Sequence, residues 1–407
     1  MPAEQRMGVD ERRKYLRLMQ PSYLRARKHQ RSQMLTHMGV ATDLDRKTLI
    51  RLLQTDLKRH PRQTKRRRTY GPDVDDALRI ITESWDYPCA ERLTPDLVWM
   101  ASHLARHGEL TIAPGLLEQL GTISIPTVRR ILTRIRQDEP RLPPPRPSGP
   151  NAALRAVPMH VIPWDISEPG HFEADLVHHC GMETDRQYMH TVQLVDVATG
   201  WSERYATLGR SYSRMQEAFR CILARLPFPI IELHPDNGSE FFNAYLLEFW
   251  AKEVASLHLT RSRPFHKNDN RFVEQRNSSE VRAYFGTHRL DTASRVWCAN
   301  RIYDKLWVYY NLFQPILHLV EKTVSPVDGG GFTTKLRHDT AKTPFDRLCA
   351  TGVLPAEKRA SLERLRDETN PRRLRQEIYD LLERTMALPC ADDCEAEPTS
   401  HKGGMAR

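Results

Sequence analysis

The order of apolar patterns between residues 172 and 286 constrains the fold of this 407-residue chain more than any other feature. β-rich runs at about 172–178, 188–196 and 201–207 predict three consecutive strands, with Gly200-Trp201 at the turn before the third. The chain then alternates between helix and strand, with elements expected at 211–226 (helix), 229–234 (strand), 239–254 (helix), 257–261 (strand) and 271–286 (helix). This order predicts an α/β fold, in which a mixed sheet is covered by helices.

Three acidic residues occupy distinctive places in this pattern. Asp175 lies in the first expected strand, within His-Phe-Glu-Ala-Asp-Leu-Val. Asp236 follows the β-rich run 229–233 and precedes Asn-Gly, which is a turn signal. Glu274 opens the expected helix at 271–286, after a loop rich in Pro and Asn. Two strand carboxylates and one helix carboxylate can converge on a pair of hard cations, and oxygen ligands suit Mg²⁺.

The motifs around these carboxylates are more specific than the acids themselves, since the chain has 51 Asp and Glu residues. Asp-Asn-Gly-Ser-Glu-Phe begins at Asp236, and Arg-Pro-x-His-Lys-Asn-Asp-Asn-x-x-Val-Glu-Gln contains Glu274. Both motifs, and the spacings of 61 and 38 residues between the three acids, resemble DDE transposases of bacterial insertion sequences, which have a retroviral-type integrase core. The resemblance covers roughly residues 160–290, and more weakly the chain to about 380. It implies a ribonuclease H-like catalytic core.

The resemblance also implies an activity. Asp175 would bridge two Mg²⁺ ions, Asp236 would hold one of them and Glu274 the other, and Mn²⁺ can substitute. The enzyme would bind the ends of a mobile DNA element and cleave them with water. The exposed 3′-hydroxyls would then attack target DNA without a covalent protein–DNA intermediate. Two active sites must act on two ends, so a homo-oligomer on double-stranded DNA is implied.

Residues near Glu274 are expected to contact DNA, and these are His266, Lys267, Asn270, Arg276 and Asn277. Positions 274 and 277 share a helix face, so Asn277 can approach the metals or substrate, whereas Arg276 points elsewhere and can contact phosphate.

Three neighbouring acids are set aside as ligands. Glu173 shares a strand face with Asp175 but matches no ligand position in the family pattern. Asp196 is expected to have a role in a turn. Asp269 lies in the loop and ranks second to Glu274 as the third ligand.

Composition favours a nucleic-acid partner. Lys and Arg number 61 against 51 acids, which gives a formal charge of +10 and a pI near 9.3, and such a field favours a polyanion. No apolar run approaches the ~18 residues of a membrane span, and neither a signal-peptide core nor an amphipathic anchor is recognisable. We therefore expect a soluble bacterial protein of the cytoplasm, associated with the nucleoid and not with a membrane.

The cysteines do not suggest a disulfide framework, because the seven are scattered. Cys390 and Cys394 have no second ligand pair nearby, so a disordered tail is favoured over a metal site there. His178-His179-Cys180 cannot all ligate one ion, since neighbouring strand residues point to opposite faces.

The N-terminal region predicts a DNA-reading module. Residues 1–30 are basic and are expected to form a mobile arm or a loose helix. Residues 31–55 predict a helix, a turn at Gly39 and a second helix capped by Asp43 or Asp45, which is the order of a helix-turn-helix. The side chains expected to face DNA are Arg46, Lys47 and Arg51. The alternative is an ordinary helical hairpin.

Two further basic features follow. The run 58–68 holds seven basic residues, among them Arg66, Arg67 and Arg68, and is expected to grip phosphates unless it is only a solvated linker. After helices at about 73–85 and 95–107, residues 114–136 predict a second helix-turn-helix, with its turn at Gly121 and Ser124 as the cap. Arg129 and Arg130 are expected on its outer, DNA-facing side.

Six prolines between residues 140 and 150 predict a semi-rigid spacer. Beyond the core we expect a buried helix stripe of Trp297, Ile302, Leu306, Tyr309 and Phe313, a loop-like region at 325–345, and charged helices at 355–386. The expected domains are 1–70 (basic arm and first helix-turn-helix), 71–138 (second DNA-binding region), 139–157 (Pro-rich linker), 158–290 (catalytic core), 291–388 (C-terminal helical region) and 389–407 (disordered tail).

Two other functions fit parts of the pattern. One is a nuclease of the same fold without strand transfer, and the other is a DNA-binding regulator derived from a transposase. The upstream DNA-reading candidates argue against the first, and the presence of all three carboxylates argues against the second.

Overall fold

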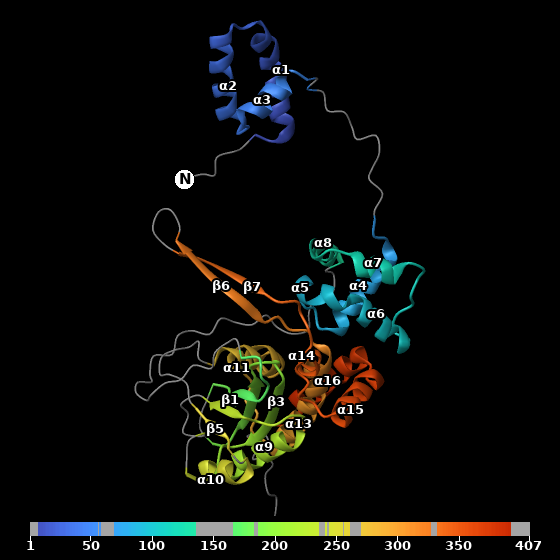
Figure 1. The fold of residues 1–407 in the computed structure, drawn as a ribbon, viewed down its shortest axis with the longest axis vertical. Helices are drawn as coiled ribbons and strands as arrows, with labels where there is room; N and C mark the ends of the chain where they lie inside the picture. Colours follow the sequence, from blue (N-terminus) through green and yellow to red (C-terminus); the bar gives the residue numbers. More distant parts are fainter. Residues whose placement is uncertain are drawn as a thin grey trace, which may run out of the picture. The chain divides into compact units, whose positions relative to one another are not determined.

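The computed structural model describes residues 7–55, 57, 69–135, 166–182, 186–235, 241, 244–254, 256–260, 270–326 and 332–391. The chain divides into two compact units, Met1–Thr69 and Tyr70–Arg407. Figure 1 labels their helices and strands. The expected Pro-rich linker at 139–157, the basic run at 58–68 and most of the expected tail lie outside the described residues.

Unit 1 is a bundle of three helices, α1 (Val9–Arg25), α2 (Lys28–Thr42) and α3 (Arg46–Leu53). Leu16 and Tyr23 of α1 are buried in a common core with Met38 and Leu49. The expectation of a mobile arm or loose helix is therefore wrong from Val9 onward, because α1 carries apolar residues that complete this core.

The turn between α2 and α3 is displaced from the predicted position. Gly39 lies inside α2, and the helix ends at Asp43, which has the left-handed φ of 54°. Asp45 caps α3, because its carboxylate accepts a 2.9 Å hydrogen bond from the Thr48 backbone N–H. A Cβ on Gly39 would lie 3.5 Å from the carbonyl oxygen of Leu44, which is an ordinary contact, so the helix would accept a side chain at this position.

Unit 2 begins with five short helices, namely α4 (Pro72–Ser84), α5 (Ala90–Leu93), α6 (Leu97–Arg106), α7 (Leu116–Thr122) and α8 (Ile125–Ile135), and a single 3₁₀ turn, η1 (Thr94–Asp96). The predicted turn at Gly121 is wrong by two residues, since α7 continues through Thr122 and the chain turns at Ile123 and Ser124. The Ser124 carbonyl accepts from the N–H groups of Thr127 and Val128, which starts α8. Whether this helix pair reads DNA stays a prediction.

The segment 70–135 is bound to the C-terminal part of unit 2. The Tyr309 hydroxyl donates to the Ser84 carbonyl at 2.9 Å, and the buried Arg375 pairs with the buried Asp86 at 2.7 Å. Separating the segment from the C-terminal helices would break this buried pair and leave uncompensated charges, which is strongly unfavourable. The segment is therefore part of the same packed body as the C-terminal helices.

A five-stranded mixed sheet lies at the centre of unit 2, in the order β3-β2-β1-β4-β5. β1 (His171–His179) is antiparallel to β2 (Met189–Asp196), which is antiparallel to β3 (Ser202–Leu208). β4 (Glu232–Pro235) is parallel to β1, and β5 (His258–Leu259) is parallel to β4. The predicted mixed sheet is confirmed, and its strand order is that of the ribonuclease H-like fold.

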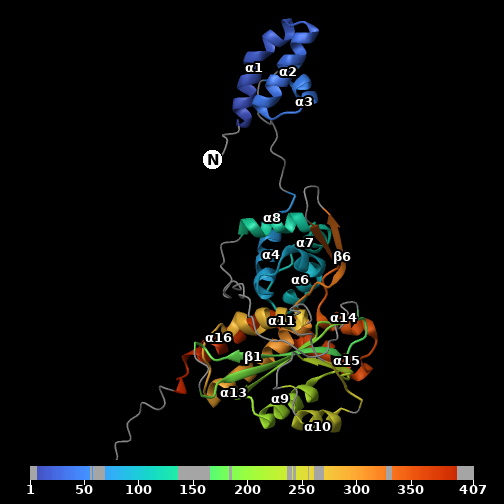
Figure 2. The same cartoon turned by 90° about the vertical axis from the view of Figure 1, so that its left-hand side faces the viewer.

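Helices cover both faces of this sheet, as Figure 2 shows. α9 (Tyr212–Arg225) and α10 (Ala244–Glu253) pack on the face of Phe172 and Ala174. The other face is covered by α11 (Arg271–Arg276), the π-helical segment η2 (Asn277–Arg282), α12 (Ala283–Phe285) and α13 (Ala293–Val308). All of β2 is buried, which is expected for a strand covered on both faces.

Beyond the core the structure departs from the sequence in two places. Trp297 is 61% exposed, with the Arg301 guanidinium over its ring, whereas Ile302, Leu306, Tyr309 and Phe313 form the predicted buried stripe through α13 and η3 (Tyr309–Phe313). The expected loop at 325–345 is wrong in part, because 332–338 form a strand, β7 (Phe332–His338), that pairs in an antiparallel hairpin with β6 (Leu319–Pro326). The last helices are α14 (Pro344–Thr351), α15 (Ala356–Glu368) and α16 (Pro371–Ala387).

None of the helices in the described residues combines the length and apolar character that a membrane crossing requires.

Candidate active site

Asp175 lies on β1, the central strand of the sheet, and is partly exposed. One carboxylate oxygen accepts the N–H of Leu176 at 2.8 Å, and the other accepts the side-chain amide of Asn277. Asn277 is the residue that follows α11, the helix that carries Glu274. The structure therefore connects the strand of the first predicted ligand with the helix of the third.

Glu173 makes a second connection between the same two elements. Its Oε2 atom accepts the backbone N–H groups of Phe272 and Val273, at 2.8 and 2.9 Å. These are N–H groups of the first turn of α11, which have no partner within the helix. Glu173 is 1% exposed, and burial raises the pKa of its carboxyl to about 8, against the lowering effect of these two hydrogen bonds. Glu173 thus holds the N-terminus of α11, immediately before the exposed Glu274.

The side chains around Asp175 offer oxygen atoms to a cation. The Oδ1 atoms of Asn270 and Asn277 are both buried, and neither has a hydrogen-bond partner among the described residues. Carboxylate and amide oxygens are the ligands that Mg²⁺ accepts. The residues present therefore fit a hard divalent cation. The described residues contain no group of three metal-binding side chains, and Asp236, the second predicted ligand, lies outside them.

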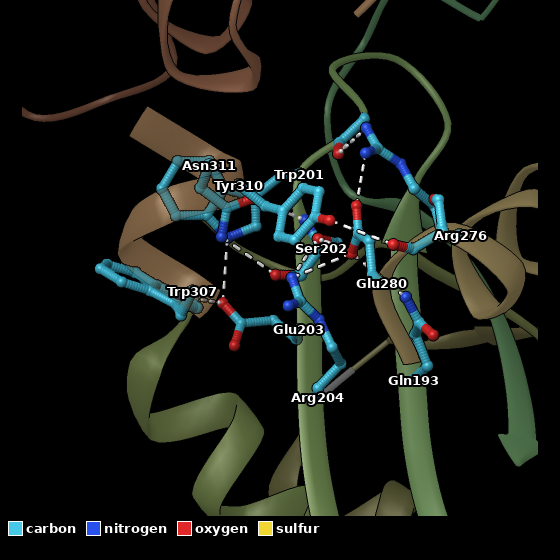
Figure 3. A network of polar contacts seen from close by, with 12 residues as sticks. Gln193, Trp201, Ser202, Glu203, Arg204, Arg276, Glu280, Trp307, Tyr310 and Asn311 are labelled. Atoms are coloured by element: carbon cyan, nitrogen blue, oxygen red, sulfur yellow. Dashed lines mark hydrogen bonds and ion pairs between the residues drawn. The ribbon is translucent and has the colours of Figure 1, made fainter. Parts of the chain in front are cut away.

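A buried polar network lies beneath this site and holds η2 against the sheet (Figure 3). Glu280 of η2 is fully buried and pairs with Arg204 of β3 at 3.0 Å and with Arg276. Its Oε2 atom also accepts from the Ser202 hydroxyl at 2.8 Å. Buried charges persist only when they are paired and hydrogen-bonded. This network fixes the segment that follows Glu274 and includes Asn277.

The structure places Arg276 differently from the prediction. Its guanidinium is 12% exposed, pairs with Glu280 and donates to the Gly200 carbonyl at 3.2 Å. The guanidinium therefore lies mostly inside the molecule in this conformation, and its contact with phosphate stays a prediction.

The other expected DNA contacts fall into three groups. Arg46, Lys47 and Arg51 are exposed on α3, although Arg46 also donates to Ser32. On α8, Arg129 pairs with Glu91, while Arg130 is exposed and donates to the Thr127 hydroxyl at 2.9 Å. Those outside the described residues are Arg66, Arg67, Arg68, His266 and Lys267. DNA contact by any of these residues stays a prediction.

Two expectations on neighbouring residues are confirmed. Asp196 has a role in a turn, since its carboxylate accepts from Gly170 N–H and from the N–H and hydroxyl of Thr199, and burial raises its pKa to about 6. His178 and His179 point to opposite faces of β1. His178 lies against the rings of Tyr188 and His190, whereas His179 bonds Thr191.

The role of Glu173 leads to a testable prediction. We expect Glu173→Ala to slow metal-dependent DNA cleavage by about 100-fold, because a displacement of about 1 Å in a catalytic group has an effect of that size. Glu173→Gln keeps an acceptor oxygen for the two N–H groups and should retain most of the activity. Rates measured across a Mg²⁺ titration should show a higher half-saturating concentration for the Ala variant. Equal rates and equal Mg²⁺ dependence in wild type and Glu173→Ala would contradict this role.

Comparison with known proteins identifies a relative. Over 294 residues the chain is 33% identical to uncharacterized protein y4rM of Sinorhizobium fredii, a match that spans 72% of this chain and 83% of y4rM. The chain belongs to the y4rM family. No known family model matches the sequence.

Three solved structures resemble this y4rM-family chain at low similarity. The simian T-cell lymphotropic virus intasome in complex with PP2A subunit B56 gamma is 13% identical, with a TM-score of 0.30, over 54% of this chain and 70% of that one. The HTLV-2 integrase catalytic core in complex with magnesium is 13% identical (TM-score 0.27), over 36% and 90%. The BIV integrase core is 15% identical (TM-score 0.29), over 45% and 95%. Sequence identities and TM-scores this low do not show that the proteins share a substrate or a mechanism.

Proposed function

We propose that this y4rM-family protein is a transposase or integrase that cleaves the ends of a mobile DNA element and joins them to target DNA. The observation that carries the proposal is the pairing of Asp175 with Asn277, together with the contact of Glu173 with the first turn of α11. These contacts bring β1 and the helix of Glu274 together, as the sequence motifs require. Asp236 directly follows Pro235, the last residue of β4, which pairs with Ala174 next to Asp175.

In this proposal Asp175, Asp236 and Glu274 hold two Mg²⁺ ions, for which Mn²⁺ can substitute. When bound, the ions would activate the attacking water or 3′-hydroxyl and neutralise charge on the leaving oxygen. The protein's own residues position the reaction. The Asn277 amide orients the Asp175 carboxylate, and Glu173 holds the N-terminus of the helix that carries Glu274. The Glu280 network fixes the segment that follows Glu274 and includes Asn277.

Unit 1 would recognise the element ends. Arg46, Lys47 and Arg51 extend from α3 on its exposed side, where a recognition helix presents base-reading side chains. The net charge of +10 favours binding of DNA by the chain as a whole.

The test uses the full chain, Mg²⁺ and a labelled duplex that carries the inverted repeats flanking its coding region. We expect nicking at the repeat ends, followed by covalent joining of the 3′ ends to a second duplex, with both steps lost in a chelator. Cleavage without any joined product would favour the nuclease. Repeat-specific binding without cleavage in Mg²⁺ or Mn²⁺ would favour the DNA-binding regulator.

A further inference from the structure

At one edge of the central sheet lie a pocket and several side chains that have no role in the proposed chemistry. His179 of β1 pairs with Met189 of β2, which pairs with Leu208 of β3. The carboxyl ends of β1 and β3 therefore lie at the same edge, and β4, which is parallel to β1, also ends on this side. α9 begins at this edge directly after β3. Ligands of open α/β sheets bind outside the carboxyl ends of the strands.

A cavity of about 330 Å³ lies at this edge, which we call the edge pocket. Arg186, Arg210 and Arg214 line it, together with Ser211, the residue before α9, and His190 of β2. Arg214 also forms an exposed pair with Glu217 at 3.2 Å, which is a weak interaction in water. The guanidinium groups and the positive end of a 14-residue helix together favour an anion. His190 pairs with His178, which lies three residues along β1 from Asp175, roughly 10 Å along the strand, and on the opposite face of the sheet.

The floor of the edge pocket holds a polar atom without a partner. His190 is 2% exposed, and its buried Nδ1 atom has no hydrogen-bond partner in the described part of the chain. The ring lies between the rings of His178 and Tyr188, at centroid distances of 4.9 and 4.5 Å. Burial, His178 and Arg210 together lower the pKa of His190 to about 3, so the imidazole is neutral at neutral pH and retains one N–H donor. A buried polar atom of this kind usually meets a ligand or water.

Two exposed tyrosines stand beside the edge pocket. Tyr212 in the first turn of α9 is 51% exposed, and Tyr245 near the start of α10 is 57% exposed. Their rings are stacked, with centroids 4.6 Å apart and planes 19° apart. Gln216 of α9 donates to the Tyr245 carbonyl at 3.2 Å, which ties the two helices together at this point. Aromatic side chains beside arginines are an arrangement by which proteins hold single-stranded nucleic acids without regard to sequence, and on a duplex such rings can pack on the exposed sugars.

We propose that the edge pocket binds a backbone phosphate of target DNA and that the Tyr212–Tyr245 pair packs against the same strand. This inference rests on the proposed function and deepens it, since a target must be held without dependence on sequence. The arginines recognise phosphate oxygens, and the tyrosines contact sugar or base without distinguishing the bases. A protein partner is disfavoured, because three of the pocket's lining residues carry positive charge and all three are exposed.

The test is binding of a duplex without repeat sequences by the full chain in the absence of divalent metal. We expect the double variant Arg210→Ala/Arg214→Ala to bind about 10-fold more weakly than wild type. The slope of log affinity against log salt should fall by about 0.9, since the pocket contributes one phosphate contact. Tyr212→Ala should weaken binding with little change in slope, because stacking involves no counterion release.

Arg220→Ala is the matched control, since Arg220 also lies on α9, is exposed and pairs with Glu253. It should bind like wild type. An Arg210→Ala/Arg214→Ala variant with the affinity and slope of the control would overturn the inference. The inference would also be overturned if inorganic phosphate stabilised the wild type but not the double variant while both proteins bound DNA equally well. The pocket would then hold a free anion. These measurements need no catalysis, so a chain that binds through the edge pocket but never cleaves would refute the proposed function alone.

Discussion

Asp236→Asn is expected to abolish cleavage and joining by at least about 10³-fold and to leave DNA binding intact. The amide keeps the shape of the side chain and removes the negative charge that a divalent cation requires. Loss of about 4 kcal/mol of transition-state stabilisation corresponds to this factor. The measurement is the rate of nicking of a labelled repeat duplex in Mg²⁺, with binding of the same duplex followed by gel shift.

Matched variants assign the other ligands. Asp175→Asn and Glu274→Gln should lose activity to the same extent, since each removes one carboxylate from the proposed set. Asp269→Asn is the control, because Asp269 is the rival for the third ligand and lies five residues before Glu274. Near-normal activity of Asp236→Asn, or loss with Asp269→Asn but not with Glu274→Gln, would contradict the assignment.

The fold of the core could be predicted from sequence because its elements have clear periodicities. Alternation of apolar residues sets the strands, and β2 differs only in being buried on both faces. The turn before β3 is also local, since Gly200 has a φ of 71°, a backbone conformation that favours glycine. Local signals of this kind do not depend on the rest of the fold.

Predictions failed where a glycine was interpreted without its tertiary contacts. The sequence predicts turns at Gly39 and Gly121, yet both residues lie inside helices. Neither has a backbone conformation that requires glycine, and a Cβ at either position would make only ordinary contacts. The glycines at 329–331 led to the opposite error, since they obscured the β-branched residues on either side that form β6 and β7. Glycine indicates conformational freedom or close approach, and only the surrounding structure determines which applies.

The acids of the candidate site can be proposed from the sequence, whereas the contacts that support them cannot. Asp175 and Glu274 are recognisable from neighbouring residues, whereas the function of Glu173 depends on a helix that begins 98 residues later. Glu173 and Asp175 are two residues apart on a strand, so the sequence does predict that both side chains lie on the same face of the sheet. This spacing is the signal that could have indicated a role for Glu173. The pairing of Arg276 with Glu280 could not be predicted, because it depends on the π-helical segment that follows α11.

Glu280→Ala is expected to lower the free energy of unfolding of unit 2 by about 3–5 kcal/mol, because it leaves two buried cations without their counter-charge. Arg204 is 1% exposed, and its Nε and Nη1 atoms are already buried without a partner among the described residues. Its guanidinium lies 5.3 Å from the centroid of the Tyr310 ring, which cannot replace a carboxylate. The measurement is chemical denaturation followed by the fluorescence of the tryptophans, which include the buried Trp201 beside this network.

Two further variants separate charge from cavity formation. Glu280→Gln preserves the side-chain volume but removes the charge, so it should still lose most of this free energy of unfolding. If the loss in Glu280→Ala came from a cavity, Glu280→Gln would be nearly as stable as wild type. Glu363→Ala is the matched control, since Glu363 forms an exposed i, i+4 pair with Arg359 and should change stability by no more than about 0.5 kcal/mol. A Glu280→Ala variant as stable as Glu363→Ala would show that the network does not hold η2. The positioning of Asn277 against Asp175 would then need another cause.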